Sequence, residues 1–326
     1  MNSTTVTRVL QSRGMVVFTA VVCAAAAFWA FRKGIVVSFT GNRGIALPSP
    51  NLWIASPVAS AWAGIAVTCC SAVLMMTLNG VYNFIRSISV LYASVFLLMQ
   101  MAVPDIVAQF YGGGVISVAV LTCVALLFSC YGGAGGNRRI FLIFFILALG
   151  SVCQYSFLLF IPVFLLGMVQ MRVFSARTCL AAAMGLITPI WILAGFGIVG
   201  LGQLRFPQFN SIFESIDTGE TLHLLFIAGA TAAVGIGSWV MNFTKMIAYN
   251  ARNRAFNGFI TLLTFAALVM MAADYGNIMA YLPVFNACAA FQTGHFIAMR
   301  QKTRGYIFIS CLWALYLSFY LWRMLV

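Results

Sequence analysis

Residues 132–177 read GGAGGNRRIFLIFFILALGSVCQYSFLLFIPVFLLGMVQMRVFSAR. A glycine-rich turn with two arginines opens this stretch, and Arg172 and Arg177 close it. Between them, Ile140–Met171 is a run of 32 residues without a formal charge. As one helix this run would be about 48 Å long, whereas the hydrocarbon core of a bilayer is about 30 Å thick. A single upright span is therefore not expected.

The run divides at its most polar point, Gln154-Tyr155-Ser156. Division there predicts two helices of about 15 residues, or about 23 Å each. That length is short for two full spans, so the pattern fits either a pair of thin helices or a re-entrant hairpin at 140–171. Both alternatives return the chain to the side of the membrane that it left.

The whole chain has the composition of an integral membrane protein. It is 63% hydrophobic and only 7% charged over 326 residues, and its mean hydropathy is +1.02. Soluble domains carry about 25% charged residues, and continuous apolar runs exclude the alternating strands of a β-barrel. We therefore predict an all-α fold, a polytopic transmembrane helical bundle that forms a single integral membrane domain over residues 1–326.

Eleven apolar segments are expected to cross or enter the membrane, and two of them form the short helical hairpin at 140–171. Their limits follow the limits of the apolar runs. The expected segments are 14–31, 54–78, 87–103, 114–131, 140–155, 157–171, 178–201, 222–243, 256–273, 278–299 and 305–326.

The basic residues set the orientation of this predicted bundle, because loops rich in Lys and Arg stay in the cytoplasm. With a cytoplasmic N-terminus, 13 of the 18 basic residues lie in cytoplasmic loops, and all five acids lie outside. A single span at 140–171 would move most of the downstream basic residues outside, which favours the hairpin. The cytoplasmic set is Arg8, Arg13, Arg86, Arg138, Arg139, Arg172, Arg177, Lys245, Arg252, Arg254, Arg300, Lys302 and Arg304. The acids are Asp105, Glu214, Asp217, Glu220 and Asp274.

Two outer loops are long enough to carry structure of their own. The loop at 32–53 contains Gly41-Asn42-Arg43-Gly44 and two prolines, and is predicted to be irregular. The loop at 202–221 carries aromatic and aliphatic residues at helical spacing, interleaved with three acids. It is predicted to form an interfacial helix on the outer surface, either as a simple connector or as an element that gates a substrate.

Charge and cysteine content further limit the classes of function that the sequence predicts. The net charge of +13 comes from Lys and Arg in short loops, where they act as topogenic signals and lipid contacts rather than as a nucleic-acid surface. All nine cysteines lie in apolar runs, without a Cys-x-x-Cys pair, and there are only two histidines. Disulfides, a metal site and a cofactor are therefore not predicted.

The acids near the ends of apolar runs are the candidate catalytic residues, because ionisable groups within a membrane domain are the default functional sites. These are Asp105, in Val103-Pro104-Asp105-Ile106, and Asp274, in Ala273-Asp274-Tyr275-Gly276. Each either caps the helix that follows it or acts at the outer face as a base or cation ligand. His295 is expected to be a polar anchor near the cytoplasmic end of its span. The candidate substrate-binding residues are Arg32, Lys33, Arg43, Glu214, Asp217, Glu220 and His223.

Several motifs of the central segment occur in a recognisable order. They are Asn137-Arg138-Arg139-Ile140-Phe141, Arg172-Val173-Phe174-Ser175-Ala176-Arg177, Gly185-Leu186-Ile187-Thr188-Pro189 and the stretch from Asp274 to Phe296. This order resembles an uncharacterised family of bacterial multi-pass inner-membrane proteins, a domain of unknown function found in envelope-rich Gram-negative bacteria. In that family a helical hairpin is followed by an R-x-F-S-x-R turn and a G-x-x-x-P span.

The hairpin also has a distant resemblance to the GT-C-type polyprenyl-phosphate-sugar glycosyltransferases, which place short paired helices in the middle of the chain. The resemblance implies an acid in the first outer loop that serves as base or metal ligand. Here 32–53 contains no acid and three basic residues. That departure favours a scaffold without this activity, or one that binds an anionic lipid-linked substrate through Arg32, Lys33 and Arg43.

The leading expectation is thus a protein of the bacterial cytoplasmic (inner) membrane that takes part in envelope biogenesis. It would handle or accompany a lipid-linked or glycan substrate as a non-catalytic subunit. The alternatives are a GT-C-like glycosyltransferase with an extracytoplasmic active site, and a transporter or flippase. The expected partners are membrane lipids, a lipid-linked saccharide and membrane-protein subunits, and nucleic acid is not expected.

Overall fold

The computed structural model describes residues 12–36, 44–85, 90–133, 136–198, 219–299 and 302–325. Within them the protein is all-α, with twelve α-helices and three short 3₁₀ turns. Eight of the helices are long and apolar enough to cross a membrane, so the polytopic helical bundle is confirmed. The helices are α2 (Arg13–Arg32), α3 (Pro57–Tyr82), α4 (Leu91–Met101), α5 (Pro104–Val107), α6 (Gly112–Ser129), α7 (Gly136–Cys153), α8 (Phe160–Gln170), α9 (Ala176–Gly195), α10 (Gly219–Ile247), α11 (Ala251–Ala273), α12 (Ile278–Met299) and α13 (Lys302–Leu325). The 3₁₀ turns are η1 (Pro50–Leu52), η2 (Tyr155–Leu159) and η5 (Tyr275–Asn277).

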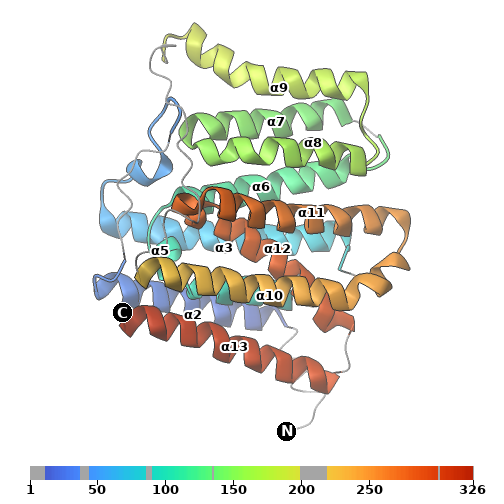
Figure 1. Ribbon diagram of the computed structural model, residues 1–326. Helices are drawn as coiled ribbons and strands as arrows, with labels where there is room; N and C mark the ends of the chain where they lie inside the picture. Colours follow the sequence, from blue (N-terminus) through green and yellow to red (C-terminus); the bar gives the residue numbers. More distant parts are fainter. Residues whose placement is uncertain are drawn as a thin grey trace.

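The long helices lie side by side in one bundle (Figure 1). The eight candidate spans are α2, α3, α6, α7, α9, α11, the 222–244 part of α10 and the Ile307–Leu325 part of α13. The remaining expected segments coincide with α4, with η2 and α8, and with α12. The interfacial helix expected at 202–221 falls outside the described residues, apart from 219–221, which belong to the start of α10.

The two ends of the bundle differ in charge. We call the end that holds α5, η2 and η5 the acidic end, because Asp105 and Asp274 lie there. The opposite end, where α7 begins and α8 ends, is the basic end. Its described Lys and Arg residues are Arg13, Arg138, Arg139, Arg172, Arg177, Lys245, Arg252, Arg254, Lys302 and Arg304. At the acidic end they are Arg32, Lys33 and Arg323.

The paired helices of the central stretch are α7 and α8, with the break at Gln154 as predicted. The pair is longer than the expected 23 Å per helix, because α7 begins at Gly136 and η2 stretches the second half. A 3₁₀ helix rises about 2.0 Å per residue, so each half is about 27 Å long. The backbone N–H of Gly132 donates to the carbonyl of Met171 at 3.3 Å, so the chain ends the pair beside the place where it entered.

Helix α9 continues the layer formed by the pair and lies beyond α7 at the edge of the bundle (Figure 1). Gly185 makes this contact possible, since a Cβ there would lie 2.5 Å from the carbonyl oxygen of Phe141 on α7. The N-terminus of α9 is closed by a capping box between Ser175 and Thr178. Much of its remaining surface is apolar and exposed, as expected of a lipid-facing helix.

Helix α12 is the centre of the bundle and packs against α4, α6, α10 and α11. Residues 280–295 are all buried. Pro283 has no N–H to donate to the carbonyl of Met279, one turn earlier, and α6 approaches at that point. A Cβ on Gly113 of α6 would lie 2.4 Å from this carbonyl oxygen, so only glycine fits there.

The described part of the first outer loop covers the acidic end. The backbone N–H groups of Ala46 and Leu47 both donate to the carbonyl of Val152 at 3.1 Å, near the C-terminus of α7. The side chain of Asn51 accepts a hydrogen bond of 3.0 Å from the backbone N–H of Gly112, the first residue of α6. The loop therefore closes over the tip of the α7–α8 pair.

Candidate functional site

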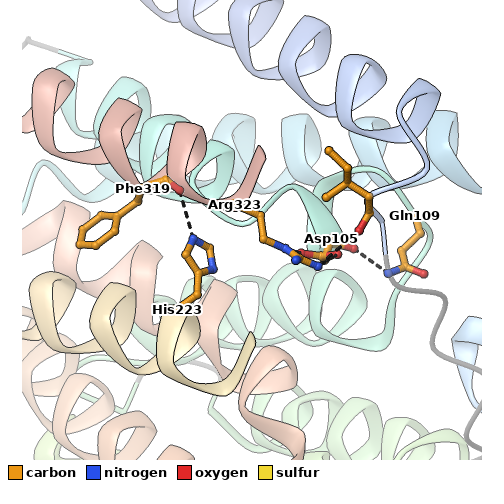
Figure 2. A network of polar contacts seen from close by, with 6 residues as sticks. Asp105, Gln109, His223, Phe319 and Arg323 are labelled. Atoms are coloured by element: carbon orange, nitrogen blue, oxygen red, sulfur yellow. Dashed lines mark hydrogen bonds and ion pairs between the residues drawn. The ribbon is translucent and has the colours of Figure 1, made fainter. Parts of the chain in front are cut away.

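Asp105 forms a bidentate ion pair with Arg323 at the acidic end (Figure 2). Nε of Arg323 lies 3.0 Å from Oδ2 of Asp105, and Nη2 lies 3.2 Å from Oδ1. The two side chains are only 2% and 7% exposed. Nη2 also donates to the carbonyl of Ile35 at 3.3 Å. A single arginine on α13 therefore ties together α5 and the chain just after α2.

The expectation that Asp105 caps the following helix is wrong. Asp105 lies in the first turn of α5, and Val103 holds the N-cap position. The cost of burying a carboxylate explains the arrangement, since an isolated charge in an apolar interior is strongly unfavourable. Arginine presents two parallel N–H groups that match the two oxygens of a carboxylate. The pair therefore neutralises both charges.

Asp274 is the second buried acid, and two tyrosines donate hydrogen bonds to it. The hydroxyl of Tyr155 lies 3.1 Å from Oδ1 and 2.9 Å from Oδ2. The hydroxyl of Tyr281 lies 2.7 Å from Oδ2. Asp274 follows the last residue of α11 and makes no capping hydrogen bond with its side chain, so the capping expectation is wrong here too. Its carboxylate instead joins α11, α12 and η2.

The contacts around Asp274 extend into a larger polar cluster. Nδ2 of Asn277 donates to Oγ of Ser156 at 2.6 Å, and the hydroxyl of Tyr111 lies 3.3 Å from Oδ1 of Asn277. Ser156 and Asn277 are completely or almost completely buried. The polar tip of the α7–α8 pair thus meets the second candidate acid, and the segment from α5 to α6 joins this cluster through Tyr111.

Gln154 and Tyr275 are the chain neighbours of two residues of this cluster, Tyr155 and Asp274. Gln154 is buried with its Oε1 against Gly112, where a Cβ would lie at a forbidden 1.6 Å. No hydrogen-bond partner for this oxygen exists among the described residues. Burial raises the pKa of the Tyr275 phenol above its usual value. The tip of the pair packs tightly against the start of α6.

The three candidate substrate-binding side chains that the structure describes, Arg32, Lys33 and His223, differ in their surroundings. Arg32 and Lys33 are exposed at the end of α2, with the Arg32 guanidinium 5.6 Å from the ring centre of Phe28. His223 is buried instead, with Nε2 3.1 Å from the carbonyl of Phe319 on α13 (Figure 2). Arg43, Glu214, Asp217 and the side chain of Glu220 fall outside the described residues.

A row of polar pairs joins α11 to α12 along their length. Besides Asp274 and Tyr281, Nε2 of Gln292 donates to Oγ1 of Thr261 at 3.2 Å. Nε2 of His295 lies 2.6 Å from Oδ1 of Asn257. His295, which was expected to be a polar anchor near the end of its span, is 1% exposed. These polar side chains explain why α12 is not among the eight strongly apolar helices.

Arg323 and Tyr281 are the main site residues that sequence reasoning missed. A signal existed for Arg323, since it is a lone cation within the last apolar segment, and a charge in such a segment needs a partner. Arg323 was also expected on the outer side of the membrane, which is the side expected for Asp105. For Tyr281 there was no comparable signal, because a tyrosine in an apolar helix is ordinary.

The chemistry of the site follows from these contacts. Each acid is directed at donors of the same chain, and no group of three His, Cys, Asp or Glu side chains in the described part of the protein could hold a metal ion. Comparison with family models, with curated proteins and with solved structures gave no match. Within the described residues, the arrangement is one of buried polar contacts that join helices.

Proposed function

We propose that this multi-pass membrane protein is a non-catalytic subunit of a bacterial envelope-biogenesis system, and that it accompanies a lipid-linked or glycan substrate in the cytoplasmic (inner) membrane. The burial of both candidate acids carries the proposal. Asp105 and Asp274 are each 1% exposed, and their oxygens are bound by Arg323, Tyr155 and Tyr281. A general base must reach the proton that it abstracts, which favours a structural role for these acids.

Arg32 and Lys33 are the residues that we assign to the anionic part of a lipid-linked substrate. Both are exposed at the end of α2, where a spanning helix meets the headgroup region. Basic side chains at that level attract phosphate groups. Arg43, in the same outer loop, belongs to this proposed set by its place in the sequence.

The segregation of charge supports an orientation with the basic end in the cytoplasm, because the positive-inside rule places loops rich in Lys and Arg there. The resemblance to the bacterial inner-membrane family agrees with this placement. In the proposed arrangement α4, η2 with α8, and α12 also pass through the membrane domain, which gives the eleven segments of the sequence-based prediction.

The test is complementation of a deletion strain, with the envelope glycan profile as the readout. Asp274→Asn keeps the size of the side chain and removes its charge, and the proposal expects a glycan profile like that of the wild type. The matched variant Arg32→Gln/Lys33→Gln alters only exposed side chains, and is expected to change the profile. Protein levels in the membrane fraction are the control for both.

The opposite results identify the alternatives. Loss of the glycan in Asp274→Asn at a normal protein level would contradict a non-catalytic role and favour the GT-C-like glycosyltransferase. Movement of a lipid-linked saccharide across proteoliposomes that contain this chain alone would favour the transporter or flippase. Co-purification of other membrane proteins in mild detergent is expected of a subunit.

A further inference from the structure

Two turns lie side by side at the basic end, next to the edge helix α9 (Figure 1). The first precedes α7 and the second joins α8 to α9. The backbone N–H of Gly132 donates to the carbonyl of Met171, and a Cβ on Gly136 would lie 3.9 Å from the methyl group of Thr178. The exposed side chains that these turns bring to one place include three arginines, which we call the arginine patch: Arg138, Arg172 and Arg177.

Among the side chains that the structure describes, no acid lies at the end of the bundle that holds the arginine patch. The chain contains five acids. Asp105 and Asp274, the two acids whose side chains the structure describes, both lie at the acidic end. Arg139, by contrast, donates from Nη1 to the carbonyl of Ser129 at 2.6 Å and so has a partner within the protein. Positive charge is therefore concentrated and exposed at the patch.

The backbone conformation of Arg172 also indicates that its side chain has a function. Its N–H donates to the carbonyl of Val169, and that of Val173 donates to the carbonyl of Met168, which is the Schellman pattern at the end of α8. Arg172 holds the left-handed position of this motif, with φ of 58°. Glycine is the usual residue there because a side chain strains the backbone. An arginine is present against that preference.

An exposed apolar surface begins beside the patch. Phe174, between two of the arginines in sequence, is 59% exposed. Leu180, Met184 and Ile187 follow on α9 at intervals of four and three residues, so they form one face of the helix. Each is more than half exposed. Because α9 spans the bundle, this face leads from the level of the headgroups into the hydrocarbon region.

We propose that the arginine patch binds the headgroup of an anionic phospholipid, whose acyl chain lies along the exposed face of α9. The phosphate oxygens accept the N–H groups of the arginines, which form bidentate contacts with phosphate. The exposed apolar face of α9 contacts the acyl chain of the lipid, and a soluble anion has no acyl chain to make this contact. This site is separate from the acids and from the substrate contacts assigned to Arg32 and Lys33.

The test uses the full chain purified in a nonionic detergent, with lipid binding measured by native mass spectrometry. The probes are phosphatidylglycerol and phosphatidylcholine with the same acyl chains. The variant is Arg172→Gly/Arg177→Gln, in which glycine suits the left-handed backbone and keeps the fold. A matched control, Arg13→Gln/Arg252→Gln, removes two other exposed arginines of the basic end.

We expect the wild type to prefer phosphatidylglycerol, and the patch variant to bind it about 25-fold more weakly, since each of the two arginines removed contributes about fivefold in affinity near an anionic surface. The control should lose less than threefold. Equal binding of the two lipids by the wild type, or equal losses in the two variants, would overturn the proposal. Displacement of the lipid by equimolar inorganic phosphate would also overturn it, because the site would then recognise phosphate alone.

Discussion

At the scale of single residues, side chains of the acidic end hold together helices that are far apart in the chain. Arg323 is three residues from the C-terminus, yet it binds Asp105 and the carbonyl of Ile35. The pair is buried, so its two charges attract each other with little screening by solvent. Its contribution to stability still depends on both partners being present, because the desolvation of each charge opposes the attraction.

Arg323→Met is expected to lower the free energy of unfolding by about 3 kcal/mol, since Asp105 would remain as an unpaired buried charge. The double variant Asp105→Leu/Arg323→Met removes both charges and should recover most of that loss. Titration of the purified protein with SDS in mixed micelles measures the differences. A double variant that is as unstable as Arg323→Met would show that the apolar replacements, rather than the unpaired charge, cause the loss.

At the scale of elements, close packing depends on glycines at a few helix contacts. Helix α6 reaches the carbonyl of Met279 on α12 because Gly113 has no side chain. Gly80 on α3 differs, since a Cβ there would meet nothing within 4 Å. The same substitution therefore has opposite consequences at the two positions.

Gly113→Ala is expected to destabilise the protein by about 1–3 kcal/mol, because the added methyl group forces the backbone of α6 away from the backbone of α12. Gly80→Ala should be neutral or stabilising by up to about 1 kcal/mol, since alanine favours the helix and the space is open. Thermal unfolding in detergent micelles compares the two variants. Equal effects would mean that α6 and α12 separate at little cost, contrary to the packing described.

At the scale of the whole molecule, the described helices segregate charge to opposite ends of the bundle. The α7–α8 pair is the element that makes this possible, since it returns the chain to the basic end before α9 begins. The expected topology therefore depends on the pair more than on any other element.

Cysteine labelling in intact cells tests this topology. Lys33→Cys is expected to react with a membrane-impermeant maleimide added outside, whereas Arg138→Cys and Arg177→Cys should react only after the cells are opened. The wild type, which contains nine cysteines, gives the background. Labelling of positions 138 and 177 from opposite sides would exclude the paired arrangement, and labelling of position 33 only in opened cells would reverse the orientation.

The sequence by itself determined the class of the protein and most of its helices. Apolar runs must be buried in lipid or protein, and backbone in lipid must be hydrogen-bonded within helices, so composition alone predicts the bundle. The break at Gln154 was also predicted, because three adjacent polar residues interrupt an apolar run that is too long for one span. These are local properties, and they do not depend on which helices are neighbours.

Only the tertiary structure decided how the polar residues are used. Arg323 and Asp105 are 218 positions apart, and Tyr155 is 119 positions from Asp274, so neither contact is visible in a local pattern. The caps expected for both acids did not form, and their carboxylates instead accept hydrogen bonds from Arg323, Tyr155 and Tyr281. His295 was expected to be a polar anchor near the end of its span, and it lies in the interior because α12 is surrounded by other helices. Local sequence sets which segments enter the membrane, whereas the packing of those segments sets what their polar side chains contact.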